Sequence, residues 1–182
     1  LQDGHDKMLA SIRGIVSSHI MPYKYLDPDA GADAWSLREF VENDECNGWV
    51  FLPYRDDQLA TLRPMVACMI DIVCKALLSM PPSDDRRIWL MLDECASLGR
   101  VTSLVDYMTK ARKAGGLAVI GLQSVAQLRD AYGRDGAQIL MSCLSNQLIL
   151  RCPDPETAQT MSRMIGDRQV TRVTGGATSQ LA

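Results

Sequence analysis

The sequence has little of the chemistry that most metal-binding and disulfide-rich proteins use. It contains two histidines, His5 and His19, and its six cysteines include no C-x-x-C pair. Zinc sites need several such ligands at short spacings, so this composition argues against a zinc centre. The cysteines are therefore interpreted as reduced and mostly buried side chains of a cytosolic protein.

Long apolar runs are also missing. The most apolar stretch, "MVACMIDIVCKALLSM" at 65–80, is interrupted by Asp71 and Lys75, so it predicts a core helix rather than a membrane span. The sequence has no pattern typical of a signal peptide. The chain opens at Leu1 inside an amphipathic helical pattern, which predicts a fragment or a chain without its natural beginning.

Neither sign of charge dominates the chain. The formal net charge is −3, which excludes a polycation that binds nucleic acid over its whole surface. DNA binding would need a local basic patch or other parts of a larger assembly. Arg129 and Arg134 suggest a DNA-facing loop, on charge alone. With 47% hydrophobic residues, 182 residues can bury one substantial core.

Strands and helices are predicted to alternate along the chain. Because the central strands are apolar on both faces, we expect a parallel sheet with helices on each side. We also expect Trp35, Trp49 and Trp89 to be packing anchors, because none of them lies in a basic segment with interleaved aromatic residues. The predicted helices span 1–21, a short segment capped by Ser36 with Glu39, 57–79 with Pro64 inside it, 101–114, 124–131, 134–143 and 155–165 capped by Asp154. The predicted strands span 48–54, 87–92, 117–123, 147–152 and 169–173.

The stretch "RIWLMLDE" at 87–94 carries the strongest chemical signal. An apolar strand that ends in Asp93 and Glu94 is typical of the second half of a nucleoside-triphosphate site. There Asp93 would hold Mg²⁺ through water, and Glu94 would polarise a water for attack on the γ-phosphate. The alternative is that both acids begin a loop and cap the next helix. The glycine-rich loop of the first half, G-x-x-x-x-G-K-[ST], occurs nowhere in the sequence.

Three further polar residues are candidates for the same site. Gln123 ends the next predicted strand, where its amide could sense the γ-phosphate, or it is simply the start of a helix. Arg112 would reach a neighbouring subunit's phosphate, or it complements the helix end beside Lys110. Arg151 would approach phosphate, or it pairs with Asp154.

Several blocks between about residues 35 and 173 occur together in one known family. The segments "GWVFLPY", "RRIWLMLDE", "ARKAG" and "GLQS" appear in the same order, and the chain resembles the ATPase domain of type IV secretion coupling proteins of the TraD type. The resemblance implies a RecA-like P-loop NTPase fold, α/β and three-layered, with a mostly parallel sheet. This fold would be incomplete, because its P-loop half is missing. Residues 1–34 would end an inserted helical domain, 35–175 would form the partial nucleotide-binding domain, and 176–182 a tail.

The resemblance also implies roles and partners. Asp93 and Glu94 match the Walker B acids, Gln123 the sensor glutamine, and Arg112 the arginine offered in trans. The implied ligands are ATP and Mg²⁺. The parent would be a hexamer at the cytoplasmic face of the bacterial inner membrane, anchored by an N-terminal segment that this chain lacks. It would drive single-stranded DNA or a relaxase–DNA complex into the channel of the secretion system.

Two other functions stay open at this point. One is a RecA-like adaptor module without catalysis, and the other is a related double-stranded DNA translocase or secretion ATPase. The chain alone should hydrolyse ATP negligibly, because phosphate binding without the P-loop loses most of its electrostatic stabilisation.

Overall fold

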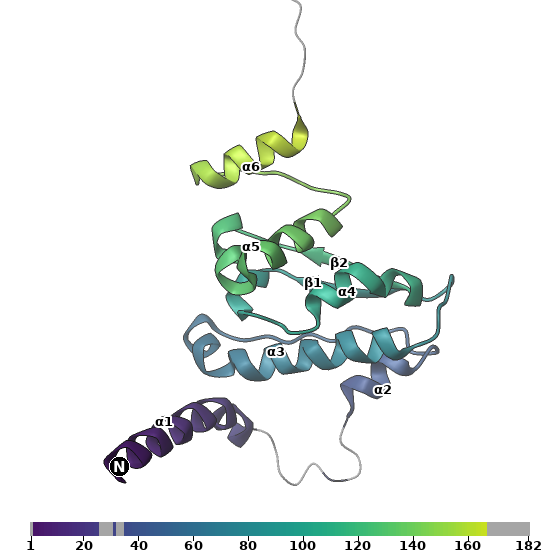
Figure 1. The fold of residues 1–182 in the computed structure, drawn as a ribbon. Coiled ribbons are helices and arrows are strands. Elements are labelled where there is room, and N and C mark those ends of the chain that lie inside the picture. The colour runs from purple at the N-terminus through teal and green to yellow at the C-terminus, as the bar shows by residue number, and fades with distance from the viewer. Residues whose placement is uncertain (1, 26–30, 32–34, 167–182) are drawn as a thin grey trace, which may run out of the picture.

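A computed structural model describes residues 2–25, 31 and 35–166 of the chain. Figure 1 shows α3 running across the molecule between α1 and the layer that holds α4, α5 and two strands. The helices are α1 (Gln2–Ile20), α2 (Leu37–Glu42), α3 (Asp56–Ser79), α4 (Leu104–Lys110), α5 (Val125–Cys143) and α6 (Pro155–Ile165). Short 3-10 helices are η1 (Met21–Tyr25), η2 (Cys95–Leu98) and η3 (Ala111–Ala114).

Two neighbouring parallel strands form the sheet. β1 (Ile88–Leu92) pairs with β2 (Gly116–Ile120) in a register that places Ile88 opposite Gly116 and Leu92 opposite Ile120. The buried Tyr107 of α4 joins them, because its hydroxyl donates to the carbonyl of Leu117 at 3.0 Å and lies 3.4 Å from that of Ile88. The predicted parallel arrangement of these two strands is confirmed.

The described helices cover one face of this sheet. Leu90 and Leu92 are buried in a core to which α3, α4 and α5 all contribute. On the other face, Trp89 and Met91 are each 53% exposed. The prediction that helices cover both faces is therefore wrong for the described residues. The prediction that tryptophans serve as packing anchors is also wrong, because Trp35, Trp49 and Trp89 are all exposed.

Two predicted strands do not form. Residues 48–54 and 147–152 run as irregular segments, with Phe51 and Leu148 largely exposed at 78% and 87%. A strand requires a neighbour that completes its hydrogen-bond ladder, and the described chain offers neither segment one. The predicted strand at 169–173 and the tail at 176–182 lie outside the described residues.

The predicted helices are present, and their ends follow local chemistry. The Ser36 hydroxyl accepts from the N–H of Glu39 at 3.3 Å, and the Asp154 carboxylate accepts from the N–H of Thr157 at 2.7 Å. α5 contains a break at Gly133, with φ +74°, which matches the prediction of two short helices. α3 keeps Pro64 in its interior. No helix of the described residues is long and apolar enough to cross a membrane.

Candidate functional site

The acidic pair lies in a tight turn directly after β1. Asp93 and Glu94 form this turn, and η2 follows at once. The Glu94 carbonyl accepts hydrogen bonds from the Ser97 hydroxyl at 2.8 Å and from the Ser97 N–H at 3.2 Å. The Glu94 backbone is thus fixed by its own turn, while its side chain is left for other contacts.

A close backbone approach ties this turn to the end of β2. The N–H of Gly121 donates to the Leu92 carbonyl at 2.7 Å, and the N–H of Cys95 donates to the Gly121 carbonyl at 3.1 Å. A Cβ atom at Gly121 would lie 1.9 Å from the Asp93 carbonyl oxygen, so only glycine fits there. The two strand ends are therefore held side by side just before Gln123.

A polar cavity of about 430 Å³ opens at this edge of the sheet. Glu94 and Gln123 both line it, as the parallel topology predicted, because the carboxyl ends of neighbouring parallel strands meet at one edge. The other lining residues come from α3, η2, the turn after η2, and α5; they are Arg63, Ala96, Ser97, Gly99, Gln127, Asp130 and Ala131.

One oxygen of the Glu94 carboxylate is buried without a partner. Glu94 Oε1 has almost no solvent-accessible surface, and it accepts no hydrogen bond. A buried carboxylate oxygen left in this state is unfavourable by about 1–3 kcal/mol or more. Because this oxygen has almost no accessible surface, a hydrogen-bond donor in the cavity would pair with it only after the Glu94 side chain rotates.

The other predicted site residues lie outside this cavity. The Asp93 side chain is exposed and does not line it. Arg112 lies in η3 before β2, at the opposite edge of the sheet from Gln123, and it is exposed. Arg151 is exposed in an irregular segment rather than at a strand end. Asp154 caps α6 and forms no ion pair with Arg151 among the described residues.

Four polar residues of the cavity were not predicted from the sequence: Arg63, Ser97, Gln127 and Asp130. Arg63 comes from α3, whereas Gln127 and Asp130 come from the first turns of α5. The α5 residues follow Gln123 at helical spacing, so that spacing was an available signal. No local signal marked Arg63, which lies in an earlier helix and faces the cavity only through tertiary packing.

Packing around the cavity depends on two buried hydrogen bonds and one exposed ion pair. The Tyr132 hydroxyl of α5 accepts from the N–H of Val101 at 3.2 Å, and burial raises the pKa of this phenol. The Thr157 hydroxyl accepts from the N–H of Val125, and Arg129 pairs with Glu156, so α6 is fastened to α5. Glu156 thus neutralises the Arg129 charge within the chain, which argues against a role for Arg129 in binding DNA.

A second anchor links α3 to the start of α4. The Asp71 carboxylate accepts from the N–H and hydroxyl of Ser103 at 2.8 and 2.6 Å, and Lys75 approaches its other oxygen at 2.5 Å. Burial acts to raise the pKa of Asp71, but the hydrogen bonds from Lys75 and Ser103 outweigh it and lower the pKa overall. The anchor therefore works with an ionised carboxylate.

Two parallel strands with a polar cavity at their carboxyl edge define an incomplete α/β domain. The similarity to solved structures of the coupling protein TrwB makes it RecA-like. Residues 1–180 match the family described as the type IV secretion-system coupling protein DNA-binding domain, and the chain belongs to this family. The resemblance seen in the sequence and the predicted fold class are thereby confirmed.

Individual relatives agree with this assignment. The chain is 30% identical over 168 residues to coupling protein TraD of Escherichia coli (strain K12), which covers 90% of the chain and 23% of TraD. It is similar to the plasmid coupling protein TrwB in complex with ADP and Mg²⁺, with 43% identity and a TM-score of 0.56 over 60% of the chain and 26% of TrwB. For TrwB with a non-hydrolysable GTP analogue, the values are 39% identity and a TM-score of 0.63 over 72% of the chain and 32% of TrwB. The chain spans less than a third of these relatives.

Proposed function

We propose that this chain supplies the Walker B half of an ATP site in a coupling protein for conjugative DNA transfer. The observation that carries the proposal is that Glu94 and Gln123 line one cavity at the ends of two parallel strands. TrwB, a relative with 43% identity, binds ADP with Mg²⁺ and a non-hydrolysable ATP analogue. Both facts point to a nucleotide at this edge.

In this proposal Glu94 is the general base. Its carboxylate takes a proton from a water whose oxygen bonds to the γ-phosphorus, while the bond from that phosphorus to the β–γ bridging oxygen breaks. ADP and inorganic phosphate leave. The Gln123 amide donates to a γ-phosphate oxygen and accepts from the same water, so it reports whether the γ-phosphate is present.

The donor set also fits a magnesium ion. Mg²⁺ prefers hard oxygen ligands and is held in such sites by one or two carboxylates, water and phosphate. Asp93, whose exposed side chain lies beside the cavity rather than in its lining, would hold the ion through water. When bound, the ion neutralises charge on the phosphate oxygens. Among the described residues no group of three or more His, Cys, Asp or Glu is placed to hold a metal, so the phosphates would complete the coordination.

The Arg112 position suits action in a neighbouring subunit. It is exposed, and β2 separates it from Gln123; a strand of five residues rises about 16 Å. We assign Arg112 to the ATP of an adjacent subunit in a hexamer. Arg151 is a weaker phosphate contact, since it is exposed away from the cavity.

The larger protein would contain the P-loop half and a membrane anchor at the inner membrane. Residues 1–34 would then end the inserted helical domain, residues 35–175 would belong to the nucleotide-binding domain and residues 176–182 would form a tail. Its partners would be single-stranded DNA or a relaxase–DNA complex and the components of the secretion channel.

The test uses the complete coupling protein. Glu94→Gln should keep the affinity for ADP and lose ATP hydrolysis by roughly 100- to 10,000-fold, because the general base is gone. Glu42→Gln, which changes an exposed acid of α2 that pairs with Arg38, is the matched control and should leave turnover unchanged. Hydrolysis at the normal rate in Glu94→Gln would show that Glu94 is not the general base, whereas a wild-type protein without any ATP hydrolysis would favour the adaptor role.

A further inference from the structure

The cavity holds opposite charges that do not neutralise each other. Arg63 and Glu94 both line it, yet no ion pair joins them within 4.0 Å. No described residue accepts a hydrogen bond from the Arg63 guanidinium, and Glu94 Oε1 is buried without a donor. Arg63 is exposed, so water can solvate its guanidinium when the cavity is empty. An occupant that pairs with both residues presents a hydrogen-bond donor to the Glu94 carboxylate and an anionic oxygen to Arg63.

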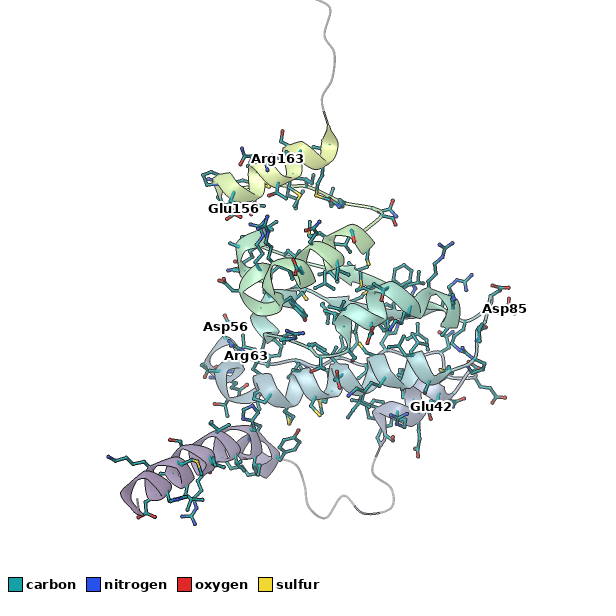
Figure 2. All side chains as sticks on the ribbon, in the orientation of Figure 1. Glu42, Asp56, Arg63, Asp85, Glu156 and Arg163 are labelled. Carbon is teal, nitrogen blue, oxygen red and sulfur yellow. The ribbon has the colours of Figure 1, made fainter. Side chains whose placement is uncertain are left out.

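The packing of Arg63 directs it toward the acidic turn. Figure 2 places Arg63 in the N-terminal half of α3. A Cβ atom at Gly99, which has φ +71°, would lie 3.6 Å from Arg63 Cδ, so the aliphatic part of the arginine passes over the turn that ends η2. The guanidinium is therefore carried by a long helix, and its stem rests on the same segment that positions Glu94.

Charge selects the kind of occupant. Arg63 is the one cationic side chain among the described residues that line the cavity, where Glu94 and Asp130 are both acidic. Two carboxylates alone would repel a phosphate group, whereas a guanidinium binds phosphate oxygens through two parallel hydrogen bonds. A terminal phosphate beside a water satisfies both groups, because the water donates to Glu94 and the phosphate accepts from Arg63.

From this geometry we infer that Arg63 binds the terminal phosphate of the nucleotide within its own subunit and makes the site prefer a triphosphate over a diphosphate. The inference rests on the proposed ATP site and adds a residue to it. ADP would leave Arg63 and the Glu94 carboxylate without that partner. Arg63 would then contact the nucleotide of its own subunit, and Arg112 the nucleotide of an adjacent subunit.

The experiment compares two nucleotides in the complete coupling protein. Arg63→Ala should weaken binding of a non-hydrolysable ATP analogue with Mg²⁺ by roughly 10- to 100-fold, the range of a charge-assisted hydrogen bond, and change ADP binding by less than about 2-fold. Arg63→Gln, which keeps the stem over Gly99, should do the same if the alanine variant folds poorly. Arg38→Ala, an exposed arginine of α2, is the charge-matched control and should bind both nucleotides normally.

Three results would overturn the inference. Equal losses for ADP and the analogue would mean that Arg63 supports the site without contacting the terminal phosphate. Unchanged binding of both would remove it from the site. Lost affinity for a single-stranded oligonucleotide, with nucleotide binding intact, would assign Arg63 to DNA phosphates instead. A wild-type protein that binds neither nucleotide would refute the proposed function itself, which separates that failure from the others.

Discussion

Gly121 lies so close to Asp93 that a Cβ atom at Gly121 would be 1.9 Å from the Asp93 carbonyl oxygen. This contact holds the acidic turn after β1 against the segment that leads to Gln123. Backbone packing therefore fixes the edge of the cavity, and it positions the side chains of Asp93, Glu94 and Gln123. A small change at Gly121 should disturb all of them together.

Gly121→Ala should destabilise the protein and separate the two strand ends. Overpacking of this kind lowers stability by about 1–3 kcal/mol, which corresponds to roughly 2–4 °C in Tm per kcal/mol for a chain of this size. Thermal unfolding measures the loss. Gly14→Ala is the control, because a Cβ atom there meets nothing within 4 Å and alanine favours the helix. Equal melting of Gly121→Ala and wild type would show that the turn is not tightly held.

Asp71→Ala should destabilise the protein by about 1–3 kcal/mol near neutral pH, because the N–H of the buried Ser103 loses its acceptor. The pKa of Asp71 is lowered in the folded state, so its contribution is fully present above the unfolded value near 3.9 and is lost as pH falls through the lowered pKa. Chemical denaturation of wild type and variant should therefore converge at acidic pH.

A surface acid on α4 provides the comparison. Asp106 pairs with Lys110 in an exposed i,i+4 pair, which contributes only about 0.3–0.5 kcal/mol. Asp106→Ala should change stability little at any pH. A pH-independent gap between wild type and Asp71→Ala would mean that its charge does not matter and that only packing was lost.

The elements that depend mainly on residues close together in the chain could be predicted from the sequence. β1 was predictable because Ile88 to Leu92 are all apolar, and the neighbouring parallel β2 brought Glu94 and Gln123 to one edge. Caps at Ser36 and Asp154 also depend on nearby residues alone.

Other features depend on contacts that local pattern does not encode. Residues 48–54 have strand-like composition but no neighbour among the described residues to complete a ladder. Trp89 reads as a core residue from its apolar run, yet it faces the side of the sheet that no described helix covers. Arg63 enters the cavity only because α3 packs beside η2.

Arg112→Ala should abolish ATP turnover in the assembled coupling protein and leave nucleotide affinity of a single subunit unchanged. The reason is its place at the sheet edge opposite Gln123, about one strand length from the cavity, so that in our proposal it serves the site of another subunit. Mixed oligomers that combine Arg112→Ala with Glu94→Gln subunits should regain part of the activity, because each defect lies in a different site. The exposed Lys113 beside it supplies the control, Lys113→Ala. Equal losses in monomers and oligomers would rule out action in trans.

Glu94 and Gln123 are proposed to act on one nucleotide. A double-mutant cycle of Glu94→Gln and Gln123→Ala, measured as the ATPase kcat of the complete coupling protein, tests it directly. Each single change should slow hydrolysis, with Gln123→Ala losing on the order of 100-fold. If both residues act on the same water and phosphate, the double variant should be little slower than Glu94→Gln alone. Losses that multiply would show that the two residues act independently and would contradict the account.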